Sequence, residues 1–168
     1  MAECTQVPSA NVFAKPENLN FDEAAALGTS WLTAYSLLFT SANVKPGDTV
    51  LVQGAGGGVS TAAIQLAHAA GLEVFVTSRS EDKRNRALEI GADAVFESGA
   101  RLPRKVDAVI ESVGASTWSH SVKSVRPGGT IAICGATTGD QPNLRESSSK
   151  IFVCKAIPWV LARISHAC

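Results

Sequence analysis

A run of glycines follows an apolar, β-branched stretch in the first third of the chain. The stretch TVLVQ at residues 49–53 leads into GAGGGVS, and an apolar, alanine-rich segment comes next. Glycines let a backbone approach a ligand closely, and a helix that starts in such a loop directs its first N–H groups at an anion. The loop therefore predicts a phosphate site, although a strict GxGxxG is absent and a flexible turn is the alternative interpretation. The residues predicted to bind are Gly54, Gly56, Gly57, Gly58 and Val59.

Polar and basic residues follow the second apolar stretch, EVFVT. In folds that bind NAD, an acidic residue about 20 residues beyond the glycine loop holds the ribose 2′-hydroxyl. Here Ser78 and Arg79 occupy that place, and Lys83 lies one turn further on. A serine can donate a hydrogen bond and two cations can neutralise a 2′-phosphate, so we predict NADP(H) as the cofactor. The alternative is a solvated basic helix start, whose charge Glu81 and Asp82 dilute.

Strand and helix patterns alternate on both sides of this loop. The hydrophobic periodicity predicts strands at 49–53, 73–77, 94–96, 107–112 and 130–134, with helices at 59–70, 82–90 and 118–125. Such alternation indicates an α/β fold with a Rossmann-type doubly wound parallel sheet. Upstream, Asn20 and Glu23 form a predicted capping box for a helix at 21–27, Gly28 is expected to break it, and a second helix is predicted at 30–42.

Composition limits the class of protein. The 168 residues are 45% hydrophobic and 18% charged, with 15 basic and 15 acidic side chains, which is typical of one soluble globular domain. Zero net charge argues against nucleic acid as a partner. No secretory signal or membrane-length apolar run is visible, so no membrane partner is expected. Cys4, Cys134, Cys154 and Cys168 are far apart, and we expect a cytoplasmic protein.

From Glu3 to Gly139 the chain resembles the quinone oxidoreductase-like branch of the zinc-type alcohol dehydrogenases, in the medium-chain dehydrogenase/reductase superfamily. The motifs that carry the resemblance are AAALG, LTAY, VKPGDTVLVQGAGGGVSTAAIQLA, LEIGAD and RPGGTIAICG. The usual family loop resembles AAGGVG. Ser60 replaces a glycine of that loop here, and it is small enough for close helix packing to survive.

The resemblance implies further cofactor contacts and two functional hypotheses. Thr33 would lie against the nicotinamide, Ser112 and Val113 would border the cofactor after the fourth strand, and Cys134 and Gly135 after the fifth. Thr33 bonding its own backbone and Cys134 as a buried apolar residue are the plainer interpretations. The chain is then the nucleotide-binding half of an oxidoreductase that transfers hydride between NADP(H) and a quinone, enone, aldehyde or alcohol. The alternative is a non-catalytic NADPH-binding remnant.

Relatives of this type are about twice as long, because a GroES-like domain supplies the catalytic groups. We assign residues 1–20 to the end of that domain, 21–142 to the NADP-binding domain and 143–168 to a tail. No catalytic residue is nominated: for Glu111 a place near the cofactor ribose or in solvent is preferred to an acid–base role. His68, His120 and His166 are scattered, so no metal site is expected in this chain. A substrate requires the missing domain, and a homodimer is left open.

The tail departs abruptly from the family pattern after Gly139. When residues 146–168 are back-translated with permitted codons and read from the third base, they give VFFKDIRVQGHTMGTRADFARL, which resembles the missing family segment. We therefore predict that the tail is a frameshift product and poorly ordered, and that the sheet is incomplete at its C-terminal edge. Loss of the next strand would expose an apolar edge at Ile131 and Ile133 and leave the chain marginally stable.

Overall fold

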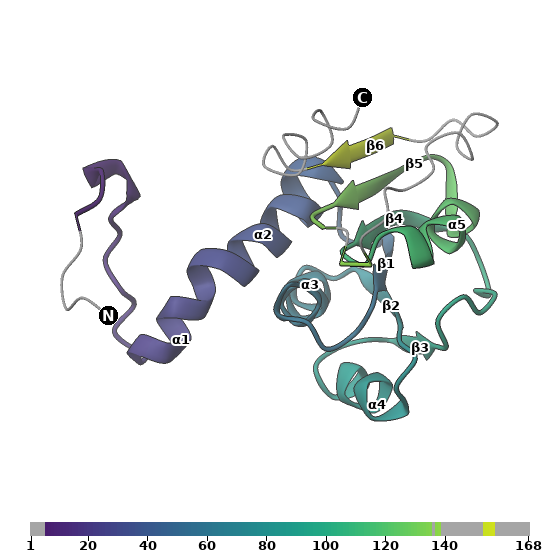
Figure 1. The fold of residues 1–168 in the computed structure, drawn as a ribbon, viewed down its shortest axis with the longest axis horizontal. Helices are drawn as coiled ribbons and strands as arrows, with labels where there is room; N and C mark the ends of the chain where they lie inside the picture. The colour runs from purple at the N-terminus through teal and green to yellow at the C-terminus, as the bar shows by residue number, and fades with distance from the viewer. Residues whose placement is uncertain (1–5, 136, 139–152, 157–168) are drawn as a thin grey trace.

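Six parallel strands form one sheet in the part of the chain that the computed structural model describes, which is residues 6–135, 137–138 and 153–156. Their order is β3-β2-β1-β4-β5-β6 (Figure 1). The strands are β1 (Thr49–Gln53), β2 (Glu73–Thr77), β3 (Ala94–Phe96), β4 (Val106–Glu111), β5 (Val125–Ile133) and β6 (Val153–Ala156). This order is that of a Rossmann-type doubly wound sheet, so the predicted fold class is confirmed.

Helices cover both faces of the sheet. They are α3 (Gly58–Ala69), α4 (Glu81–Glu89) and α5 (Ala115–Ser124). All five residues of β1 are buried, and alternate residues belong to different cores. Val50 and Val52 lie in the core that contains the apolar face of α3, whereas Leu51 lies in the core that contains Trp118 of α5. A central parallel strand has no solvated face, which is why its sequence is a largely apolar run without polar alternation.

A continuous helical segment precedes the sheet. It consists of α1 (Phe21–Ala26), a π-helical turn (Leu27–Trp31), α2 (Leu32–Tyr35) and a second π-helical turn (Ser36–Ser41). The predicted capping box is present, because Asn20 Oδ1 accepts from the Glu23 N–H and Glu23 Oε2 accepts from the Asn20 N–H, both at 2.9 Å. The predicted break at Gly28 is wrong. One glycine costs a helix about 1 kcal/mol, which is too little to end a segment flanked by good helix formers.

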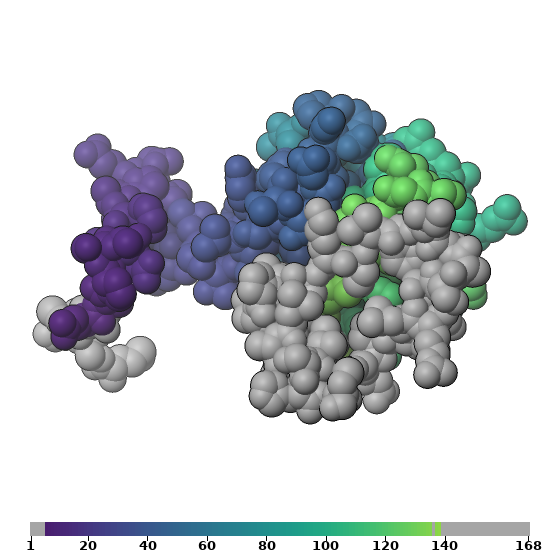
Figure 2. Space-filling model, turned by 90° about the horizontal axis from the view of Figure 1, so that it is seen from above, coloured from purple at the N-terminus to yellow at the C-terminus, as the bar shows by residue number. Residues whose placement is uncertain are grey.

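The beginning of the described chain stands apart from the sheet. Residues 6–20 and α1 extend away from the sheet and its helices in Figures 1 and 2. Phe13 and Phe21 are 84% and 81% exposed, and the first buried residue is Ala34. The core of the described fold therefore starts within α2, and the proposed boundary at residue 20 stays a prediction.

Strand β6 corrects the expectation for the C-terminal edge. The sequence predicted an unpaired edge at Ile131 and Ile133, but these residues pair in register with Cys154 and Ala156 of β6, and both are buried. A parallel ladder is made by backbone N–H and C=O groups, so a segment can supply it whatever its side chains are. The other residues of the predicted tail, 143–152 and 157–168, lie outside the described residues.

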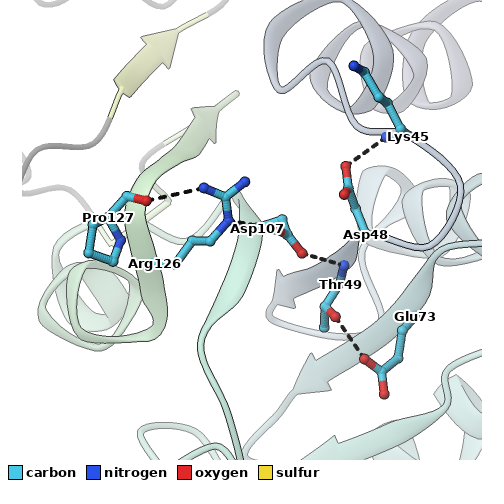
Figure 3. Close-up of polar contacts among 7 residues, drawn as sticks. All are labelled: Lys45, Asp48, Thr49, Glu73, Asp107, Arg126 and Pro127. Atoms are coloured by element: carbon cyan, nitrogen blue, oxygen red, sulfur yellow. Dashed lines mark hydrogen bonds and ion pairs between the residues drawn. The ribbon is translucent and has the colours of Figure 1, made fainter.

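Polar contacts join the amino ends of the central strands (Figure 3). The glycine loop lies at the other end of these strands, after β1. Asp107 of β4 accepts hydrogen bonds from the Thr49 N–H at 2.8 Å and from Arg126 Nε at 2.6 Å. The Thr49 hydroxyl donates to Glu73 of β2, also at 2.8 Å. These contacts join four neighbouring strands, which leaves the carboxyl ends free to form a ligand site.

Candidate nucleotide site

A cavity of about 980 Å³ lies where β1, β2, β4 and β5 end. Ligands of open α/β sheets bind at this edge, beside the point where the strand order reverses. The sequence predicted five of its lining residues, which come from three separate loops and from helix α4: Gly54, Ser78, Arg79, Lys83 and Val113. The other lining residues are small or polar: Ala55, Thr77, Ser80, Ser98, Ser116, Thr117, Thr137 and Thr138.

The glycine loop is held in place by backbone contacts. Gly54 has a φ of 80°, and a Cβ added to it would lie 2.7 Å from Val113 Cγ2, so only glycine fits. The N–H groups of Gly54 and Ala55 both donate to the Thr77 carbonyl, at 3.1 and 3.0 Å. The Ser60 hydroxyl donates to the Gly54 carbonyl at 2.7 Å, and Ser60 is buried. The serine that replaces a family glycine is therefore accommodated by a hydrogen bond within the loop.

The start of α3 is the part of this loop that is predicted to bind an anion. Gly57 is the N-cap, and the helix begins at Gly58, so the first N–H groups of α3 have no acceptor within the helix. Gly58 is a close-approach glycine, since a Cβ there would lie 2.5 Å from Ser30 Oγ. At Gly56, with a φ of 98°, a Cβ would lie 2.8 Å from Lys83 Cδ, so the lysine stem passes directly over the loop. Val59 continues the first turn.

The loop after β2 and the first turn of α4 carry the predicted cations. Arg79 and Lys83 are exposed at the cavity, whereas Ser78 is buried and its Oγ accepts from the Ser80 N–H at 3.3 Å. Ser80 caps α4. Arg84 Nη1 donates to the Ser78 carbonyl at 2.8 Å and so anchors this loop. Sequence reasoning missed Arg84, although its position four residues beyond the N-cap places it beside the loop.

Gly56, Gly57, Gly58 and Val59 are not among the lining residues of the cavity, and neither are the four remaining predicted residues. Thr33 is half-buried on α2. Ser112 and Gly135 lie together after β4 and β5, because a Cβ on Gly135 would be 3.5 Å from the Ser112 carbonyl. Cys134 is buried; its burial, and then the nearby Glu111 charge, raise the pKa of its thiol to about 11. The cofactor contacts predicted for Thr33, Ser112, Cys134 and Gly135 therefore stay predictions.

Glu111 is neither at the cavity surface nor in solvent, which corrects the place expected for it. Its side chain is fully buried. The two carboxylate oxygens accept four donors: the N–H groups of Val113 and Gly114 and the hydroxyls of Thr117 and Ser121. The residue supports the cavity wall from beneath.

Comparison with known proteins identifies the family. Residues 58–157 match the family described as zinc-binding dehydrogenase. The chain belongs to the zinc-binding dehydrogenase family, within the medium-chain dehydrogenase/reductase superfamily. It is 34% identical over 161 residues to the quinone oxidoreductase of Mus musculus, a match that covers 89% of this chain and 49% of that protein. The chain spans about half the length of the curated relatives it matches.

Solved structures of this zinc-binding dehydrogenase type share the fold. The quinone oxidoreductase of Thermus thermophilus, which was solved also with NADPH, is 31% identical, with a TM-score of 0.77 over 96% of this chain and 56% of that one. An NAD-dependent alcohol dehydrogenase is 34% identical, with a TM-score of 0.77 over 89% of this chain and 47% of that one. Because one relative was solved with NADPH and the other is described as NAD-dependent, the choice of cofactor must be argued from this chain's own residues.

Potential zinc ligands are scattered over the residues that the structure describes. These residues contain no group of three or more histidine, cysteine, aspartate or glutamate side chains placed to hold a metal ion. His120 uses both ring nitrogens, against Gln53 and the Ala100 carbonyl, each at 2.8 Å. His68 packs on Gly91, and His166 lies outside the described residues. Among the helices of the described residues, none is long and apolar enough to cross a membrane.

Proposed function

We propose that this chain binds NADP(H) as the nucleotide half of an oxidoreductase. The observation that carries the proposal is the cavity at the carboxyl ends of the strands, where a glycine loop faces two cations, Arg79 and Lys83. The site has the size of a ligand pocket, and its described lining contains no aspartate or glutamate. A dinucleotide fits this donor set, with its pyrophosphate at the start of α3 and its adenosine toward Arg79.

The charge of the second loop favours NADP(H) over NAD(H). An NAD-selective site needs an acceptor for the ribose 2′-hydroxyl, and a carboxylate there would repel a 2′-phosphate. Glu81 and Asp82 lie in the first turn of α4 but are not among the lining residues. Arg79 offers a planar fork that matches a phosphate, and Lys83 adds a second positive charge.

When bound, the nicotinamide supplies or accepts a hydride. We propose a quinone, enone, aldehyde or alcohol as the reaction partner, because the relatives include quinone oxidoreductases and an alcohol dehydrogenase. The second candidate function is a non-catalytic NADPH-binding remnant. It is favoured by the cavity lining, where we nominate no acid–base group. A cytoplasmic location and a homodimer are further proposals.

Calorimetric titration with NADPH and NADH tests the cofactor assignment. We expect tighter binding of NADPH, and Arg79→Ala should remove most of the preference. A charge-assisted contact to phosphate contributes about 1.5–3 kcal/mol, which corresponds to roughly 10- to 150-fold in affinity. Arg86→Ala is the matched control, because Arg86 is an exposed arginine of the adjacent helix α4 that pairs with Glu89 and does not line the cavity. Equal affinity of the unaltered chain for both nucleotides would refute the assignment.

Turnover by the purified chain separates the two functional candidates. We expect no NADPH oxidation with quinones and no stoichiometric zinc, because hydride transfer needs an oriented acceptor and the described half supplies no pocket for one. Robust oxidation, followed by the loss of NADPH absorbance, would exclude the non-catalytic candidate. Activity that appears only when the missing domain is supplied would favour the oxidoreductase.

A further inference from the structure

The proposed nucleotide site lies on a buried polar network that joins two of its walls. Thr77, at the end of β2, donates to Gln53 Oε1 at 2.5 Å, and Gln53 Nε2 donates to Ser121 Oγ at 3.0 Å. Ser121 in turn donates to Glu111 Oε2 at 2.6 Å. Gln53, Glu111 and Ser121 are fully buried, and Thr77 is 1% exposed. The network therefore runs beneath the cavity, from the wall formed by β2 to the helix α5.

Glu111 ends this network in the wall after β4. Its Oε1 accepts from the Val113 N–H at 2.8 Å and from the Gly114 N–H at 3.1 Å, and Thr117 donates to both oxygens at 2.9 and 3.0 Å. Gly114 has a φ of 103° and a ψ of −139°, a conformation that only glycine adopts readily. The carboxylate thus holds a turn that requires glycine. Val113 of this turn and Thr117 in the first turn of α5 both line the cavity.

The donor set favours a carboxylate. Two N–H groups and two hydroxyls converge on Glu111, and an ionised carboxylate accepts from all four, whereas a glutamine would present an NH₂ group to hydroxyls that would have to turn and accept. The charge also lies at the N-terminus of α5, where the helix dipole offsets part of the cost of burying it. Because Glu111 already fills the N-terminus of α5, the start of α3 is left as the helix terminus for the pyrophosphate.

We propose that Glu111 is a positioning residue of the nucleotide site. It fixes the Val113–Gly114 turn against the glycine loop and, through Ser121 and Gln53, ties that turn to Thr77 in the opposite wall. The contact that depends on it is visible at Gly54, whose missing Cβ leaves room for Val113 Cγ2. This inference rests on the proposed function, because it assigns the network to dinucleotide binding.

Titration of NADPH and NADH into Glu111→Gln tests the role. Glu111 acts on the cavity shape and not on the 2′-phosphate loop, so both dissociation constants should rise about tenfold and their ratio should stay unchanged. Ser121→Ala removes one donor of the network without touching the cavity lining and should raise both constants by a smaller factor, about threefold. Arg79→Ala should instead change mainly the ratio of the two dissociation constants.

Val109→Ala is the matched control for a merely structural effect. Val109 is a fully buried residue of the same strand, in the core that contains Trp118 and Val122, and it has no place in the network. Urea unfolding of each variant sets conditions under which it is folded, and there Val109→Ala should bind both nucleotides as the unaltered chain does. Unchanged binding by Glu111→Gln would overturn the inference. If that variant does not fold, unchanged binding by Ser121→Ala overturns it. Failure of the unaltered chain to bind either nucleotide would refute the proposed function itself.

Discussion

Ser60→Gly should destabilise this chain, even though glycine is the residue of the usual family loop. The Ser60 side chain is 3% exposed, and its hydroxyl donates to the Gly54 carbonyl at 2.7 Å. Losing that hydrogen bond costs about 0.5–1.5 kcal/mol. Glycine is about 0.5 kcal/mol less favourable than serine within a helix, so we expect the free energy of unfolding to fall by about 1–2 kcal/mol in total.

Equilibrium unfolding in urea measures this loss, and thermal unfolding gives an independent value. For a domain of this size, 1 kcal/mol shifts Tm by about 2–4 °C. Ser60→Ala removes the same hydroxyl, but alanine returns about 0.5 kcal/mol of helix propensity, so it should be the milder variant. Thr61→Gly, one residue further along α3, measures the cost of a glycine in this helix without the loop hydrogen bond. Ser60→Gly as stable as the unaltered chain would refute the account of the loop.

Three further outcomes follow from single contacts. Burial alone raises the pKa of Asp107, but hydrogen bonds from Thr49 and Arg126, together with the Arg126 charge, outweigh it and hold the pKa below 3.8. The stabilisation by Asp107 is therefore present at pH values above its pKa in the unfolded chain, and it is lost as the pH falls through its pKa in the folded chain. Urea unfolding should show that Asp107→Asn destabilises the chain at neutral pH and does so much less at about pH 2. The buried Cys134 thiol, with its raised pKa, should resist iodoacetamide until the chain unfolds, as peptide mass spectrometry would show. Gly91→Ala places a Cβ 2.7 Å from His68 Cγ and should lower stability in thermal unfolding more than Gly99→Ala, where φ is also positive but no atom lies within 4 Å.

Local rules were sufficient for the central elements of the fold. The runs TVLVQ and EVFVT became β1 and β2 with the predicted bounds, because a strand buried on both faces is typically a short, largely apolar run. Asn20 was identifiable as a cap from one acidic residue three positions later. The glycine loop was found from its place between a strand and a helix. Each of these features depends on neighbours in the sequence, which a single chain displays.

Contacts between distant residues were out of reach. Glu111 follows an apolar strand and looks like a carboxylate at the surface, because nothing in its neighbours shows that Ser121, ten positions later on α5, donates to it. Gly28 looked like a helix end, yet tolerance of a glycine depends on the residues that flank it. The pairing of β5 with β6 joins segments on either side of residues 139–152, and the sequence of neither segment predicts that it pairs with the other.

The position of β6 makes the frameshift prediction more specific. In the shifted reading the family-like stretch IRVQG takes its bases from codons 151 to 156, and the structure places β6 at Val153–Ala156, so the strand and the shifted stretch coincide. The second and third bases of every shifted codon are fixed by the first two bases of the original codon, which restricts chance agreement even though third bases were chosen. Sequencing the encoding DNA decides the matter. We expect the nucleotides from codon 146, read from the third base, to give a peptide close to VFFKDIRVQG, and a peptide without that likeness would end the idea. We further expect a chain with the shifted-frame tail to unfold at higher urea, because a tail that matches its fold adds buried apolar contacts that backbone pairing alone does not supply.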